Sequence, residues 1–103
     1  MKSSEFDDNA LKFLEDLAMQ IEKADKKYLL GVDFINGVLN IELEDGRLYI
    51  INKHLPSKQI WLSSPASGAD YFSPKDNKWL NKNNLSITSV IATELKDLYG
   101  MEL

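Results

Sequence analysis

The sequence predicts an α+β fold: a two-layer sandwich in which N- and C-terminal helices pack on one face of a mainly antiparallel sheet. Apolar residues recur every three or four positions near both ends of the chain, whereas they alternate in short runs through the middle. The chain has 103 residues, 44% of them hydrophobic and 27% charged, which suits one domain with one core. We therefore expect residues 1–103 to form a single domain whose sheet has one face open to solvent.

The first expected element is a helix over residues 5–26. Ser3 or Ser4 is expected to cap its N-terminus, and acidic residues in the first turn suit the helix dipole. Its apolar stripe consists of Phe6, Ala10, Phe13, Leu14, Leu17, Ile21 and Ala24.

The next strong signal is a β-hairpin formed by residues 38–44 and 47–52. Asp45 and Gly46 lie between these two alternating runs, and an Asp-Gly pair is typical of a two-residue hairpin loop. A two-residue loop places Leu43 opposite Leu48. The sequence therefore predicts that Leu48 and Ile50 face the core.

The remaining elements are shorter. A strand is expected before the hairpin, with a turn at Asn36-Gly37, and several strands follow it before a final helix capped by Asn84 or Ser86. The expected strands cover residues 32–35, 60–63, 71–72 and 78–80, and the expected helix covers residues 86–99.

The strand at residues 60–63 presents a tryptophan on its polar face. Alternation places Ile60 and Leu62 toward the core, which leaves Trp61 beside Gln59 and Ser63 on the opposite face. Such a tryptophan either packs over its cross-strand neighbours or serves as an anchor for a protein partner. The sequence leaves both interpretations open. Trp79, the other tryptophan, is expected to be partly buried.

Several classes of function are disfavoured. A net charge of −4 argues against nucleic-acid binding, and the lack of cysteine excludes thiolate metal sites. The single histidine, His54, precedes Pro56 and is expected to be a surface loop residue, and no nucleophile elbow or phosphate loop is present. We therefore expect a protein that is not an enzyme.

The N-terminal sequence is acidic and lacks the apolar core of a signal peptide, and no run of residues is apolar enough to span a membrane. A cytoplasmic protein without a membrane partner is expected.

The first helix carries an acidic stripe. Residues 1–25 hold seven acidic residues against three lysines. Asp8, Glu15 and Glu22 are spaced seven apart, Asp25 continues the stripe, and Asp33 follows on the first strand. Carboxylates suit divalent and ferric ions, but side chains two turns apart lie about 10 Å from one another. The stripe could offer several weak metal sites, a surface for a basic partner, or only a solvated helix face.

Three segments together resemble the frataxin family. These are NGVLNIELEDG, IINKHLPSKQIWLSSPASG and NKW, which occur in this order and match both the bacterial and the mitochondrial branches. The resemblance covers essentially the whole chain. It implies two terminal helices on an antiparallel sheet, as the periodicity predicts.

The resemblance also implies a function. Frataxins bind iron weakly through an acidic ridge and act in iron–sulfur cluster assembly, where they dock on a cysteine desulfurase and its scaffold protein, and an iron-donor role has been proposed. It implies reversible binding of ferrous or ferric iron at the acidic stripe, for which the sequence offers Asp8, Glu15, Glu22, Asp25 and Asp33. A monomer is expected. Asn52, Gln59 and Trp61 match the family's partner-binding residues on the sheet surface.

The acidic ridge departs from the bacterial pattern at several positions. That pattern has acids where this chain has Ala18, Met19, Lys23, Lys27, Leu29 and Gly31. High iron loading is therefore not expected, whereas docking through the sheet is unaffected. The alternatives are a ferroxidase or iron-storage activity, and a protein-binding module that works without metal.

Overall fold

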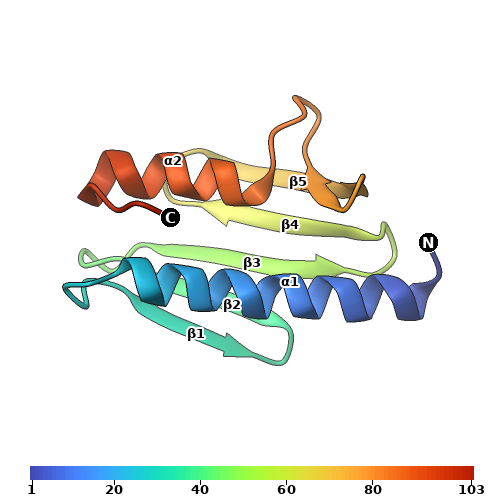
Figure 1. The fold of residues 1–103 in the computed structure, drawn as a ribbon, viewed down its shortest axis with the longest axis horizontal. Coiled ribbons are helices and arrows are strands. Elements are labelled where there is room, and N and C mark those ends of the chain that lie inside the picture. The colour runs from blue at the N-terminus through green and yellow to red at the C-terminus, as the bar shows by residue number, and fades with distance from the viewer.

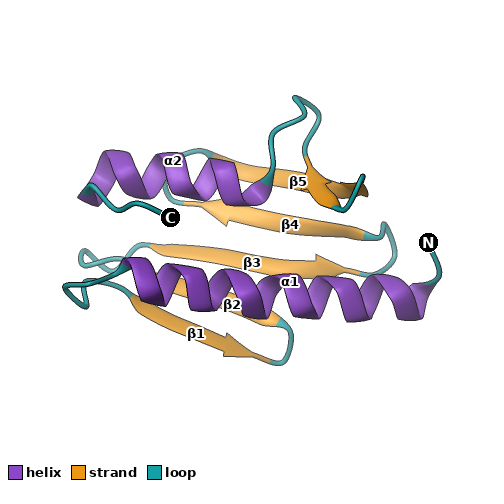
Figure 2. Cartoon of the chain, in the orientation of Figure 1, coloured by secondary structure: helices purple, strands orange, loops and turns teal.

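A computed structural model describes residues 1–103 as two helices packed on one six-stranded antiparallel sheet (Figures 1 and 2). The predicted α+β sandwich is confirmed. The strands lie in the sheet in the order in which they follow along the chain, from β1 to β6. The elements are α1 (Ser3–Ala24), β1 (Gly31–Ile35), β2 (Val38–Glu42), β3 (Leu48–His54), β4 (Gln59–Ser64), β5 (Gly68–Lys75), β6 (Lys78–Leu80) and α2 (Ile87–Tyr99).

Both helices cover the same face of the sheet. Helix α1 lies over the half of the sheet that holds β1 to β3, and α2 lies beside it over the other half (Figure 1). The second face of the sheet is left open. Neither helix is long and apolar enough to cross a membrane.

The two helices begin differently. Helix α1 starts at Ser3, and its N-cap is Lys2, which provides no side-chain hydrogen bond, so the predicted serine cap is wrong. Helix α2 follows the prediction, because the Ser86 hydroxyl oxygen accepts a hydrogen bond of 3.2 Å from the backbone N–H of Ser89. Gly100 closes α2 in the left-handed conformation, with φ of 70°.

The loop of the β2–β3 hairpin has three residues, not the two predicted. The backbone N–H of Leu43 donates to the carbonyl of Arg47 at 2.8 Å, which leaves residues 44–46 as the loop. Gly46 has φ of 89°, as expected where a turn is followed by a left-handed residue.

The longer loop shifts the strand register by one residue. Ile41 pairs with Tyr49, and Asn40 pairs with Ile50. A one-residue shift exchanges the faces of a strand. Leu48 and Ile50, predicted to face the core, therefore lie on the open face with 43% and 38% of their surface exposed, and Tyr49 is buried instead.

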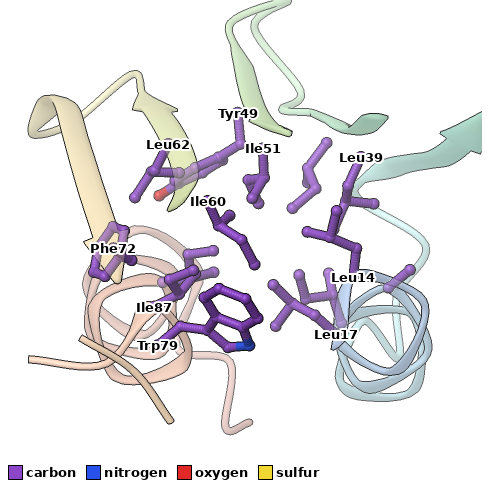
Figure 3. Packing of buried hydrophobic residues seen from close by; sticks show 14 of the residues in the cluster. Leu14, Leu17, Leu39, Tyr49, Ile51, Ile60, Leu62, Phe72, Trp79 and Ile87 are labelled. Atoms are coloured by element: carbon purple, nitrogen blue, oxygen red, sulfur yellow. The ribbon is translucent and has the colours of Figure 1, made fainter. Parts of the chain in front are cut away.

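The core fills the space between the helices and the sheet (Figure 3). Trp79 is only 7% exposed, more buried than the sequence suggested. Its indole meets the Phe6 ring edge-on at 5.7 Å and the Phe13 ring at 6.2 Å, which joins β6 to α1. The fully buried large side chains are Tyr49, Phe6, Phe72, Leu14, Leu17, Ile21, Leu39, Ile41, Ile51, Ile60, Leu62 and Ile87.

A polar network joins α2 to the sheet beneath it. The Glu94 carboxylate accepts hydrogen bonds from the hydroxyls of Tyr49, Ser64 and Ser67, at 2.8, 2.5 and 2.7 Å. Burial raises the pKa of the Tyr49 hydroxyl above its ordinary value, and the hydrogen bond to Glu94 and the charge of its carboxylate add to the rise. The network therefore stabilises a neutral Tyr49 below α2.

Candidate functional site

The open face of the sheet presents Trp61 at the middle of β4. Its neighbours Ile60 and Leu62 are buried under the helices, so the predicted alternation is confirmed. Across the strands, Asn52 pairs with Trp61 on one side and Tyr71 on the other. Directly paired residues point to the same face, so these three side chains form one row across β3, β4 and β5.

Trp61 is half-buried and is contacted on three sides. The His54 imidazole stacks on its indole, with ring centroids 3.7 Å apart and planes 15° from parallel. The Tyr71 ring meets the indole nearly edge-on at 5.2 Å. The indole N–H donates to the Gln59 amide oxygen at 3.2 Å, and the Gln59 amide nitrogen donates to the Ser73 hydroxyl at 3.2 Å. The two interpretations of Trp61 are thus compatible, since the ring is packed and still reaches the surface.

The predicted partner-binding residues lie together. Gln59 accepts a hydrogen bond from Trp61, and Asn52 is the cross-strand partner of Trp61. The Asn52 amide nitrogen donates to the backbone carbonyl of Lys53 at 3.1 Å.

The sequence did not predict two of the residues that contact Trp61, namely His54 and Tyr71. The break in the pattern was expected at His54, yet β3 continues through His54, which pairs with Gln59. The connecting turn is short because Lys58 adopts φ of 52° and its N–H donates to the carbonyl of Leu55 at 3.0 Å. Strand alternation could have indicated the position of His54. It is two residues from Asn52, and residues two apart in an extended strand lie on the same face. Tyr71 lies in a predicted strand, but its place beside Trp61 follows only from the β4–β5 register, which the sequence did not specify.

We call His54, Trp61 and Tyr71, with Gln59, the Trp61 cluster. It offers aromatic surface with a polar edge, on a face that no element of the chain covers. Aromatic residues of this kind are enriched where proteins bind one another. Chemically, the cluster suits recognition of a protein partner.

The acidic residues of α1 are spread along the helix. Asp8, Glu15 and Glu22 are all exposed. No three His, Asp or Glu side chains come together so as to hold one metal ion. These carboxylates therefore fit separate, mostly hydrated contacts with cations and do not fit a closed metal site.

Asp25 serves the backbone. It lies just beyond the end of α1, is only 5% exposed, and accepts hydrogen bonds from the N–H groups of Leu29 and Leu30 at 2.8 and 2.9 Å. Both carboxylate oxygens are thus engaged in holding the loop between α1 and β1. Asp25 does not extend the exposed stripe of α1.

Asp33 lies on the edge strand β1, paired with Asn40. Its neighbours Val32 and Phe34 pack against the core below the helices. Alternation along the strand therefore points Asp33 to the open face, away from the acids of α1. Asp33 and the exposed acids of α1 therefore lie on opposite faces of the sheet.

Comparison with known proteins gives consistent matches. The sequence model of the frataxin-like domain matches residues 1–101. The mitochondrial frataxin homologue of Saccharomyces cerevisiae is 31% identical over 90 residues, which cover 86% of this chain and 52% of that protein. The chain thus spans about half the length of this relative.

Solved structures share the fold. Frataxin from Psychromonas ingrahamii superposes with a TM-score of 0.79 at 20% identity, covering 100% of this chain and 96% of that one. Trimeric frataxin from the yeast Saccharomyces cerevisiae, described as complexed with ferrous iron, has a TM-score of 0.75 at 30% identity, covering 97% and 90% of the two chains. The family model spans nearly all of the sequence and the fold agrees with these structures, so the chain belongs to the frataxin family.

Proposed function

We propose that this protein is a non-enzymatic, iron-binding regulator of iron–sulfur cluster assembly, which docks on a cysteine desulfurase and its scaffold protein. The observation that carries the proposal is the Trp61 cluster. A large aromatic side chain stands among polar neighbours on the face that the helices leave open, in a chain of the frataxin family. Action in the cytoplasm as a monomer, with no nucleic acid or membrane as partner, stays a prediction from the sequence.

Iron enters the proposal as cargo or as a modulator. A yeast frataxin structure is described as complexed with ferrous iron, which supports iron binding in the family. In this chain the exposed carboxylates of Asp8, Glu15 and Glu22 provide hard oxygen ligands on α1. Because these carboxylates do not converge on one point, we propose weak and reversible binding of iron, and we propose iron donation to the scaffold as a second role.

Docking is tested by measuring binding to a cysteine desulfurase and its scaffold, followed by cluster-assembly rates. Trp61→Ala should weaken binding by at least about tenfold, the size of effect expected for an aromatic anchor. Leu98→Ala, an exposed residue of α2 on the other side of the molecule, is the control and should bind like wild type. Equal binding of both variants would refute the assignment of the Trp61 cluster.

Iron binding is tested separately by titrating Fe(II) while recording amide NMR spectra. Perturbations should follow the exposed acids of α1 and decrease when Glu15 and Glu22 are changed to Gln. Perturbations confined to another region would contradict this placement.

The dispersion of the acids favours one alternative, a protein-binding module that works without metal. Charge reversals at Glu15 and Glu22 that leave cluster assembly intact, while Trp61→Ala abolishes it, would select this alternative.

A ferroxidase or iron-storage activity would need facing ligands like those of di-iron bundles. An oxygen-consumption assay with Fe(II), compared with a Glu22→Gln variant, distinguishes that activity from simple binding.

A further inference from the structure

His54 is the closest aromatic neighbour of Trp61, and the strand register explains why. His54 and Trp61 lie on adjacent antiparallel strands, one step diagonal to each other, because His54 pairs with Gln59 and Asn52 pairs with Trp61. Diagonal neighbours on one face are within reach of long aromatic side chains. The two rings use this reach to stack at 3.7 Å and 15°.

The imidazole is itself held in place. Its Nδ1 atom lies 2.7 Å from the hydroxyl oxygen of Ser57, in the turn that connects β3 to β4. Ser57 therefore fixes the rotation of the imidazole, and the imidazole covers one face of the Trp61 indole.

The other contacts restrain the rest of the indole. Gln59 holds the ring nitrogen and is anchored in turn by Ser73 on β5. Tyr71 meets the indole with an interplanar angle of 71°. With His54 on a face, a hydrogen bond at the nitrogen and Tyr71 nearly perpendicular, the two side-chain torsions of Trp61 are fixed before any partner arrives.

We propose that His54 is a positioning residue, which holds the Trp61 indole in the orientation that a protein partner meets. The proposal deepens the proposed function and rests on it for the partner. Ordering a mobile side chain at an interface weakens binding by about 2- to 10-fold, so an indole already ordered by His54 avoids that loss. His54 acts through Trp61, and a stacked ring at position 54 is what the role needs.

The test begins with the free protein, where no partner is required. The indole N–H proton of Trp61 is followed by NMR, and that of the buried Trp79 serves as an internal reference. Ring stacking shifts nearby protons, so His54→Ala should move the Trp61 signal and leave the Trp79 signal in place. His54→Phe, which can still stack, should keep nuclear Overhauser contacts between residues 54 and 61.

Binding to the desulfurase–scaffold complex is then measured for the same variants. His54→Ala should bind about 2- to 10-fold more weakly than wild type, His54→Phe should restore affinity to within about twofold, and Ser57→Ala should give an intermediate loss. Leu55→Ala, an exposed residue of the same turn, is the matched control and should bind like wild type.

Two results would overturn the positioning role. One is an unchanged Trp61 signal in His54→Ala, and the other is a moved signal with unchanged affinity. If wild type itself fails to bind the complex, the proposed function fails, and the Trp61 signal alone then decides whether His54 orients the indole.

Discussion

At the scale of the residue, the same side-chain type serves different ends according to its surroundings. Asp25 and Glu22 are three positions apart in an acidic segment, yet Asp25 is buried with both oxygens accepting from backbone N–H groups, whereas Glu22 is exposed. Hydrogen bonds to a charged acceptor are among the stronger ones in proteins. Asp25 therefore contributes to stability and Glu22 to surface charge.

Asp25→Ala should lower the free energy of unfolding by about 1.5–3 kcal/mol, because two backbone donors lose a charged acceptor. Glu22→Ala, the exposed control, should stay within about 0.5 kcal/mol of wild type. Urea unfolding followed by circular dichroism measures both. An Asp25→Ala variant as stable as its control would show that the loop does not depend on this carboxylate.

The raised pKa of Tyr49 predicts that the free energy of unfolding decreases at alkaline pH. Its folded pKa lies above the value of an unfolded tyrosine, so its contribution is fully present below about pH 10 and is lost as the pH rises beyond that. The limiting slope for one group is about 1.4 kcal/mol per pH unit. Urea unfolding between pH 8 and pH 11 should show the stability gap between wild type and Tyr49→Phe constant at first and then narrowing. A gap that stays constant throughout would contradict the buried, hydrogen-bonded hydroxyl.

At the scale of the element, periodicity and turn residues together predicted the type of every helix and strand, while the β2–β3 register depended on one loop residue. Asp45-Gly46 signals a turn, but the signal does not say whether Glu44 belongs to the strand or to the loop. Because Leu48, Tyr49, Ile50 and Ile51 are all apolar or aromatic, alternation could not correct the error. Packing selected the register that buries Tyr49, where its hydroxyl meets Glu94.

The three-residue loop makes Gly46 sensitive to substitution. At φ of 89° a side chain is strained, so Gly46→Ala should destabilise the protein by about 1–2 kcal/mol. Gly31→Ala is the control, because its added Cβ would lie 3.6 Å from the Glu42 Cβ in ordinary contact. Chemical denaturation of the two variants tests the left-handed conformation of Gly46, and equal stabilities would contradict it.

The site shows the same division between what a sequence does and does not specify. Alternation alone placed Trp61 and Gln59 on the open face, and the family pattern added Asn52. His54 was missed because a proline two residues later marks a break, although the strand ends only after His54. Asp25 is separated from the exposed acids of α1 because the helix ends before it, and Asp33 is separated because it points to the open face of the sheet. The spacing of residues along a helix indicates neither of these facts.

At the scale of the whole molecule, the two tryptophans report on opposite sides of one sheet. Trp61 lies on the open face, and Trp79 packs against α1 in the core. A single domain of this size should unfold in one cooperative step. In Trp79→Phe and in Trp61→Phe, the fluorescence of the remaining tryptophan and the far-ultraviolet circular dichroism should therefore give the same midpoint. Separate midpoints within one variant would mean that one face opens without the other.

The order of the strands, which follows the order of the chain, has a consequence for how fast the native state is reached. Each hairpin needs only a short loop and can close within microseconds, whereas the contact of Phe6 with Trp79 joins segments near both ends and carries a larger loop-closure entropy. We expect the hairpins to form before this contact. In stopped-flow experiments Trp79→Phe should therefore mainly accelerate unfolding, and Gly46→Ala should mainly slow refolding. In a sheet whose strands follow chain order, the turns would then set the rate of refolding. The contact between Phe6 and Trp79 would set the lifetime of the native state.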